Sequence, residues 1–165
     1  IELTKGSLTL GNLIVEPFAV SHDAADPIGI NVFAGKDKAT VVTDTGVISD
    51  SILHHMDDTT LLVLEANYDP HMLRFGPYQP FLKQRVASDE GHLSNEMAAQ
   101  ALLMMNRPDF MQVILAHRSE NNNNAVLVTQ TIGKMLVDGG VRIGPEMKLQ
   151  HGQPNEIVSM KSVKR

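Results

Sequence analysis

Cysteine is absent from this sequence of 165 residues. The chain can therefore form neither a disulfide bond nor a thiolate zinc site, and any bound metal must be held by histidine, aspartate or glutamate. Long apolar runs are absent too, because stretches such as Leu61 to Leu64 and Val113 to Ala116 are far shorter than the roughly 20 residues that cross a bilayer. We therefore expect a protein with no membrane span.

Positive charge is also in short supply. Lys and Arg number 14 against 19 Asp and Glu, which gives a net charge of −5 with neutral histidines. This balance argues against broad electrostatic adhesion to nucleic acid, although it is compatible with a local basic patch. With 42% hydrophobic and 20% charged residues, the composition is that of one globular domain or a large part of one, and it excludes an intrinsically disordered chain.

The spacing of the apolar residues predicts strands that alternate with helices. We expect strands at 13–20, 28–33, 39–43, 60–64 and 111–116, and two weaker strands at 146–150 and 156–160. We expect helices at 47–56, 78–87 and 95–106, and a fourth that follows the Asn run 121–124 and ends at Gly139-Gly140. This alternation is typical of a layered α/β (or α+β) domain, in which ligands bind beside strand ends.

Three polar residues follow predicted strands at the point where each strand ends. They are His22, Asp44 and His117. Imidazole nitrogen and carboxylate oxygen are the ligands that a protein without cysteine has for zinc or manganese, and neighbouring strand ends lie only about 5 Å apart. Taken singly, each residue is more simply explained as a turn or cap residue. Taken together, they form a candidate metal site.

The sequence segments around these residues resemble those of a known family. In order, they are Ser21-His22-Asp23-Ala24-Ala25-Asp26-Pro27, Thr43-Asp44-Thr45-Gly46, Leu64-Glu65-Ala66-Asn67-Tyr68-Asp69, Gly91-His92-Leu93-Ser94-Asn95 and Leu115-Ala116-His117-Arg118-Ser119-Glu120-Asn121-Asn122. Over nearly the whole chain they are similar to the second half of the YycJ/WalJ-like proteins of the metallo-β-lactamase superfamily. The resemblance implies that residues 1–165 are the C-terminal half of a single domain, a four-layer αββα sandwich with a two-metal centre at one edge of its sheets.

The resemblance also implies metal-binding roles. His22 resembles a histidine that binds one metal, Asp44 the carboxylate that bridges both metals, and His117 the histidine that completes the shell of the second metal. The family's His-x-His-x-Asp-His loop, which supplies the other ligands, is not found in this sequence, where the only close histidine pair is His54-His55. We therefore expect an N-terminal half to be missing.

The start of the sequence agrees with a missing half, because Ile1 to Lys5 show neither an initiator methionine nor the pattern of a signal peptide. The missing N-terminal half is then the chain's expected partner. The chain alone should be inactive and should aggregate, dimerise or co-purify with that half. We expect the whole protein to be cytoplasmic.

Residues beside the candidate ligands are secondary candidates. His92 could act in catalysis, facing the metals or binding a substrate phosphate with the N-terminus of the following helix, or it could simply pack locally. Glu65 and Asn67 could orient a ligand, because a metal-bound imidazole needs a partner for its other nitrogen. Arg118 and Ser119 could clamp an anionic oxygen, although a solvated Arg118 is the simpler alternative.

Asn95 and the remaining cations and histidines have simpler roles or more than one possible role. Asn95 is also a candidate for substrate binding, or else part of the helix cap. We interpret several remaining cations as surface charge and several remaining histidines as ordinary surface or packing residues. They are Lys83, Arg85, Lys161, Lys164 and Arg165, and His54, His55 and His151.

The function that the resemblance implies is metal-dependent hydrolysis. The expected reaction is that of a phosphodiesterase, a DNA exonuclease acting from the 5′ end, with a hydroxide held by two divalent ions, zinc or manganese. DNA is an expected partner by resemblance alone, since composition does not favour it. Two alternatives stay open: a hydrolase of thioesters, lactones or lactams on the same scaffold, and a non-catalytic half-domain that serves as a binding or scaffold subunit.

Overall fold

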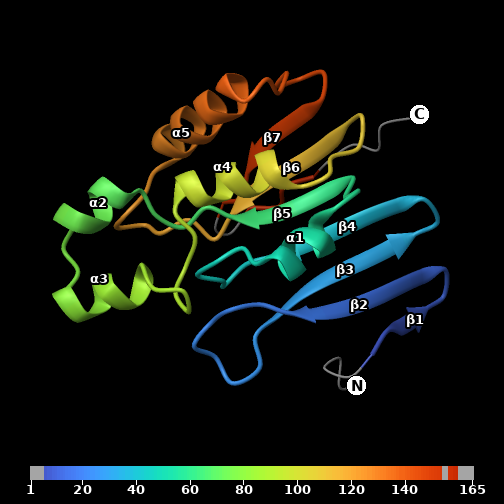
Figure 1. The fold of residues 1–165 in the computed structure, drawn as a ribbon, viewed down its shortest axis with the longest axis horizontal. Helices are drawn as coiled ribbons and strands as arrows, with labels where there is room; N and C mark the ends of the chain where they lie inside the picture. The colour runs from blue at the N-terminus through green and yellow to red at the C-terminus, as the bar shows by residue number, and fades with distance from the viewer. Residues whose placement is uncertain (1–5, 154–155, 160–165) are drawn as a thin grey trace.

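The computed structural model describes residues 6–153 and 156–159, which form one seven-stranded sheet and five helices. The order of strands in the sheet is the order in the chain (Figure 1). The strands are β1 (Leu8–Leu10), β2 (Leu13–Ala19), β3 (Ile28–Ala34), β4 (Asp37–Val42), β5 (Leu61–Glu65), β6 (Met111–Ala116) and β7 (Met147–His151).

Strand direction determines where the functional residues can gather. Strands β1 to β4 form an antiparallel meander, and β4 to β7 are parallel. The carboxyl ends of β4, β5 and β6 therefore meet at one edge of the sheet. Strand β2 ends at the same edge, because it is antiparallel to β3, which is itself antiparallel to β4.

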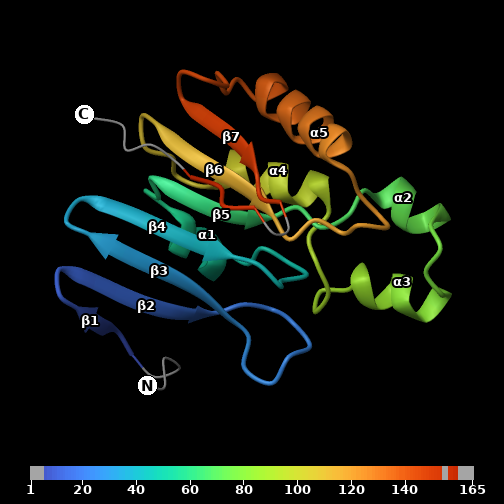
Figure 2. The same cartoon turned by 180° about the vertical axis from the view of Figure 1, so that it is seen from behind.

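The helices cover one face of the sheet. Helices α1, α4 and α5 lie against that face, whereas α2 and α3 lie beyond the carboxyl end of β5 (Figures 1 and 2). The helices are α1 (Asp50–Met56), α2 (Pro70–Phe75), α3 (Pro80–Val86), α4 (Asn95–Met104) and α5 (Ala125–Asp138). Within the part of the chain that the structure describes, none of them is long and apolar enough to cross a membrane.

The hydrophobic core lies between the sheet and these helices. Alternate residues of the parallel strands point into it, including Leu62, Leu64 and Val113. They pack with Leu102 of α4 and Ile132 of α5, and all five side chains are fully buried. Burial of each such side chain contributes about 1.5–3 kcal/mol, so this layer fixes the parallel strands and with them the site edge.

The α/β class is confirmed, and most of the predicted elements are present. The five main strands lie within two residues of their predicted bounds, and the weaker strand at 146–150 is β7. The predicted strand at 156–160 is wrong, because residues 156–159 form no strand; Met160 lies outside the described residues, as do Lys161, Lys164 and Arg165.

The helix boundaries are less well predicted. Helix α1 begins at Asp50 rather than at residue 47, because the Ser49 side chain accepts a hydrogen bond from the Ile52 N–H and caps the helix there. Helix α2 was not predicted, although the sequence carries its signal. Asp69 accepts from the Met72 N–H, and Pro70 occupies the first helical position.

The other face of the sheet carries no helix among the described residues (Figure 2). The strand register brings alternate apolar residues together there: Val15, Val32, Ile30, Val41, Val63 and Ile114. All six are only partly buried. An apolar sheet face of this extent is typical of a surface that packs against another layer.

We expect this chain, produced alone, to self-associate at micromolar concentration, because that face presents apolar side chains to water. Replacing the neighbours Val63 and Ile114 by lysine should shift the chain towards monomer, whereas Val137→Lys on the exposed surface of α5 should not. Sedimentation velocity measures the change. A single monomer peak for the unmodified chain would contradict this prediction.

Candidate metal and hydrolytic site

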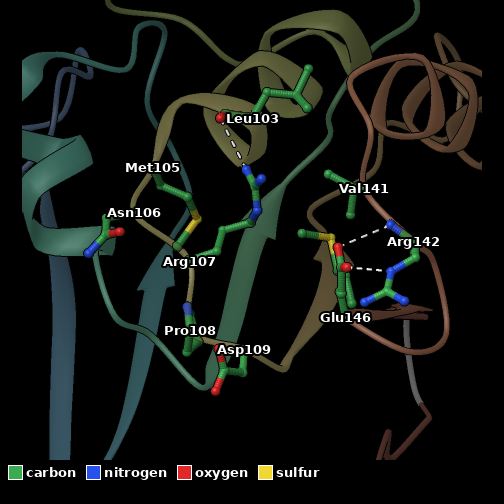
Figure 3. Close-up of a pocket in the computed structure, with 10 residues that line it drawn as sticks. Leu103, Met105, Asn106, Arg107, Pro108, Asp109, Val141, Arg142 and Glu146 are labelled. Carbon is green, nitrogen blue, oxygen red and sulfur yellow. Dashed lines mark hydrogen bonds and ion pairs between the residues drawn. The ribbon is translucent and has the colours of Figure 1, made fainter.

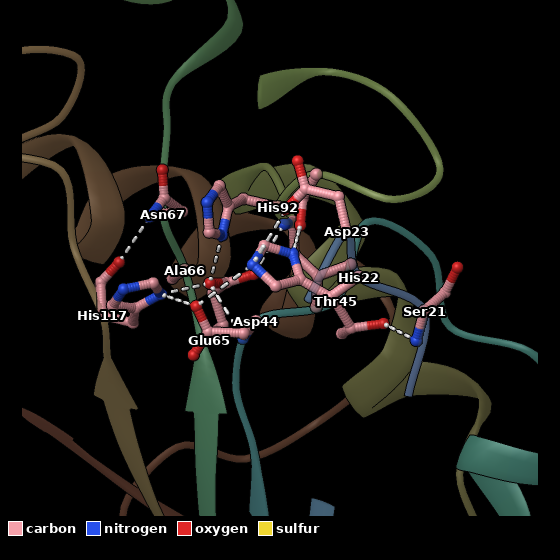
Figure 4. A network of polar contacts seen from close by, with 12 residues as sticks. Ser21, His22, Asp23, Asp44, Thr45, Glu65, Ala66, Asn67, His92 and His117 are labelled. Atoms are coloured by element: carbon pink, nitrogen blue, oxygen red, sulfur yellow. Dashed lines mark hydrogen bonds and ion pairs between the residues drawn. The ribbon is translucent and has the colours of Figure 1, made fainter. Parts of the chain in front are cut away.

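The candidate site lies at the edge where the parallel strands end (Figure 4). Glu65 is the last residue of β5, and Asp44 and His117 follow β4 and β6. Asp44 and His117 both have left-handed backbones, with φ of 56° and 51°. Such values are uncommon outside glycine and concentrate at functional sites. They turn the chain sharply where these two side chains leave the sheet.

Glu65 is the centre of the polar network. Its side chain is fully buried, and it accepts a 2.8 Å hydrogen bond from the Leu93 N–H and a 2.9 Å bond from His92 Nδ1. His117 Nδ1 and the Asp44 N–H also donate to it. Three of these four donors share Oε2, and the Leu93 N–H bonds to Oε1. Glu65 therefore orients the residues around it.

Charge couples Glu65 to His117. Burial raises the pKa of Glu65, but the hydrogen bonds from His117 and His92 outweigh it, so the net pKa lies below the ordinary value. The hydrogen bond to Glu65 raises the pKa of His117, against the opposing effect of burial. In the absence of a metal, the two side chains therefore favour an imidazolium–carboxylate pair.

His22 comes to the same place from β2. Its Nδ1 lies 3.0 Å from the Gly91 carbonyl oxygen, and since a carbonyl only accepts, Nδ1 carries the proton. Nε2 is the nitrogen that this bond leaves available, and it lies 3.5 Å from Asp23 Oδ1 and 3.8 Å from Asp44 Oδ1. The His92 ring lies between the other two, with centroids 5.0 Å from His22 and 5.1 Å from His117.

The donor set fits a divalent metal. Asp44, Glu65, His92 and His117 each offer a ligand atom, and these atoms lie within 4.8 Å of one another. The Glu65 oxygens are already occupied by hydrogen bonds, whereas the Asp44 carboxylate is 44% exposed. In His22 and His117, Nδ1 is anchored by an acceptor and Nε2 is left to bind, which is the usual arrangement of a metal-bound imidazole. Nitrogen and oxygen donors of this kind suit zinc or manganese.

Two asparagine side chains hold the backbone next to the site. Asn67 Nδ2 donates a 2.8 Å hydrogen bond to the His117 carbonyl oxygen and so fixes the turn after β6. Asn123 donates to the carbonyl oxygens of Ala66 and Asn67. The structure does not bring Asn95 to the pocket as predicted: its side chain is fully buried and bonds to Asn123 instead.

The site opens into a cavity of about 500 Å³. The predicted residues His22, Asp44, His92, His117, Asn67, Arg118 and Ser119 all line it. Arg118 Nη1 is buried and has no hydrogen-bond partner in the structure. This nitrogen is closed to solvent and is not itself a contact for a substrate. Arg118 as a residue lines the cavity, and a guanidinium is suited to an anionic oxygen of a substrate.

Six further residues of the cavity were not predicted, and Val86, Glu120 and Asn121 are among them. Tyr78, Leu82 and Arg85 line it from the α3 side. Arg85 Nη2 donates a 2.8 Å hydrogen bond to Asp23, the neighbour of His22, and this bond lowers the pKa of the Asp23 carboxyl. Arg85 is therefore more than the surface charge predicted for it. Nothing in the local sequence indicates a pair whose partners lie 62 residues apart.

A second cavity, of about 590 Å³, lies at the opposite edge of the sheet (Figure 3). It contains no histidine, and both of its arginines are occupied. Arg107 donates to the carbonyl oxygens at the end of α4, and Arg142 pairs with Glu146. Its residues do not form a metal site.

Comparison with known proteins agrees with this geometry. A family model described as "Beta-lactamase superfamily domain" matches residues 2–117. The exodeoxyribonuclease YycJ of Bacillus anthracis is 34% identical over 146 residues, covering 88% of this chain and 55% of YycJ. The chain thus spans about half the length of this curated relative. The resemblance to YycJ/WalJ-like proteins is confirmed.

Solved structures show the same fold. The metallo-β-lactamase fold protein YhfI from Bacillus subtilis superposes with a TM-score of 0.60 at 14% identity, covering 89% of this chain and 50% of YhfI. Zn²⁺-bound PqqB from Methylobacterium extorquens superposes with a TM-score of 0.56 at 15% identity, covering 92% of this chain and 49% of PqqB. At such low identity these matches establish the fold alone.

In the metal-free protein, we expect Glu65→Gln to bring the pKa of His117 down towards its ordinary value of 6.5, because the amide removes the charge that stabilises the imidazolium. In the unmodified protein, the raised pKa of His117 and the lowered pKa of Glu65 make the pair's contribution to the unfolding free energy complete between pH 4.5 and 6.5. That contribution is lost as pH rises through the pKa of His117 or falls through that of Glu65.

An NMR titration of the His117 ring measures this change. Glu16→Gln on β2 is the control and should leave the His117 titration as it was. An unchanged His117 pKa in the Glu65→Gln protein would show that the pair does not form.

Proposed function

This chain belongs to the beta-lactamase superfamily domain family, and from that premise we propose that the protein containing it is a metal-dependent hydrolase of phosphodiester bonds, acting as a DNA exonuclease. The observation that carries the proposal is the convergence of His22, Asp44 and His117 at the mouth of one cavity. The name of the relative YycJ, an exodeoxyribonuclease, supports the choice of DNA. The position of Arg118 in the lining of this cavity supports an anionic substrate.

The proposed metal site combines the exposed carboxylate of Asp44 with Nε2 of His22 and of His117. We propose that these residues would hold part of a site for two divalent ions, zinc or manganese, to which the Asp44 carboxylate would contribute. Ions held by these residues would supply an activated water as nucleophile and a Lewis acid for a phosphoryl oxygen. Arg118 and Ser119 would hold a phosphate oxygen from the cavity wall.

His92 is the proposed proton donor to the leaving oxygen. Its Nδ1 bonds to the buried Glu65 carboxylate, which holds the ring and leaves Nε2 as the free nitrogen. A histidine positioned in this way can protonate an alkoxide as it departs. Glu65 acts through His92 and is a positioning residue.

The remaining ligands belong, in this proposal, to the rest of the protein. The chain spans about half of its relative YycJ, and it contains no His-x-His-x-Asp-His loop. We propose that an N-terminal half supplies this loop and packs a second sheet on the helix-free face, which completes four layers. The chain alone would then be inactive. A cytoplasmic location is part of the same proposal.

We expect Asp44→Asn in the full-length protein to lower metal content and to reduce DNA hydrolysis by about 100-fold or more, since metal polarisation is worth several kcal/mol and each 1.4 kcal/mol is tenfold. Asp58→Asn is a matched control, because Asp58 has the same left-handed backbone, with φ of 56°, but lies outside the site. Mass spectrometry of bound metal and release of nucleotides from labelled DNA measure the effects. Full metal content and activity in Asp44→Asn would contradict the proposal.

We expect His92→Ala to slow DNA hydrolysis by about 100-fold. The same variant should hydrolyse thymidine p-nitrophenyl phosphate nearly as fast as the unmodified enzyme, because p-nitrophenolate leaves without a proton. His54→Ala, at a side chain that is 87% exposed, should change neither rate. Equal losses on both substrates would argue that His92 has another role, such as binding metal.

A further inference from the structure

The segment between β5 and α4 carries unusual surface aromatics. We define the rim lobe as residues 70–87, which contain α2 and α3. Phe75 is 67% exposed and Phe81 is 71% exposed. A single exposed apolar residue is normal. Two phenylalanines at such exposure, six residues apart, point to a binding surface for flat, apolar groups.

The rim lobe is also locally basic in an acidic chain. Residues 70–87 contain Arg74, Lys83 and Arg85 and no Asp or Glu, whereas the whole chain has a net charge of −5. Lys83 Nζ donates to the Arg74 carbonyl oxygen, and the Arg74 guanidinium lies 5.3 Å from the Phe75 ring centroid. Neither contact neutralises a cation. Two positive charges therefore accompany the exposed rings.

The rim lobe adjoins the candidate site. Tyr78 and Arg85 line the same cavity as His22 and His117. Phe81 lies three residues after Tyr78 and four before Arg85, so it is on the same side of α3 as Arg85. The Arg85–Asp23 pair fastens this side of α3 to the residue next to His22. A strand that leaves the cavity along α3 from Arg85 would therefore pass Phe81, one helical turn away.

We propose that the rim lobe binds single-stranded nucleic acid, with Phe81 stacked on a base next to the scissile phosphate and with Arg74 and Lys83 near backbone phosphates. This inference rests on the proposed function and specifies that the nucleic acid is bound as a single strand. Aromatic stacking with flanking cations is how proteins hold single strands without reading sequence. A protein partner fits less well, because protein interfaces are depleted in lysine. Arg85 pairs with Asp23, but the contacts that the structure shows for Arg74 and Lys83 are with a ring and a carbonyl oxygen and leave both charges unbalanced.

The test uses the full-length, metal-loaded protein and a phosphorothioate oligonucleotide that resists cleavage. Phe81→Ala should weaken binding about tenfold, and Phe81→Trp should restore it. Met104→Ala is the control, because Met104 is 68% exposed but lies on α4 outside both cavities. Arg74→Gln and Lys83→Gln should each reduce the slope of log Kd against log salt by about 0.7.

An abasic oligonucleotide separates stacking from a structural effect. It should bind the unmodified protein more weakly, and Phe81→Ala should then add little further loss. Equal losses on normal and abasic strands, or no loss on either, would overturn the inference.

Three further outcomes have distinct meanings. Protection of Phe81 from hydroxyl-radical labelling in the DNA-free full-length protein would show that other parts of the polypeptide cover it, and would overturn the inference. If the unmodified enzyme hydrolyses neither DNA nor the p-nitrophenyl ester, the proposed function fails. If the unmodified enzyme hydrolyses DNA and the Phe81→Ala variant binds DNA normally, the inference fails while the proposed function stands.

Discussion

The buried carboxylate of Glu65 is the interaction on which the site depends. It joins four segments that are distant in sequence: the end of β5, the turn at Asp44, the loop at His92 and Leu93, and the turn at His117. A charge in this position is tolerated only because donors surround it. The same bonds that satisfy the charge fix the rings of His92 and His117. The burial of one acid thus determines the geometry of the residues proposed to bind metal and move protons.

The parallel part of the sheet determines the position of Glu65. Continuous apolar runs make β5 and β6 strands that are buried against the helices, and parallel pairing brings their carboxyl ends to one edge. The helices fill one side of the sheet, while the other side keeps an apolar surface. The same sheet therefore provides an ordered edge for chemistry and a face suited to another layer.

Local signals explain what could be predicted from sequence. The buried strands were predictable because their apolar runs are short and uninterrupted, and the candidate ligands because polar residues end those runs. Helix α2 could have been predicted from Asp69-Pro70, a cap followed by a favoured first residue. The Arg85–Asp23 pair, the burial of Asn95 against Asn123 and the contacts of Glu65 depend on tertiary packing of distant segments, for which the sequence carries no local signal. The exposed Phe81 likewise follows from the orientation of α3.

Chain order within the sheet has a consequence for assembly. Each strand pairs with its neighbour in sequence from β1 to β7, so the ladder needs no strand from outside residues 8–151. In the proposed parent protein, the two halves would meet through the side chains of the helix-free face. Separately expressed fragments of that protein should be able to reassociate into a working enzyme, as in a split reporter.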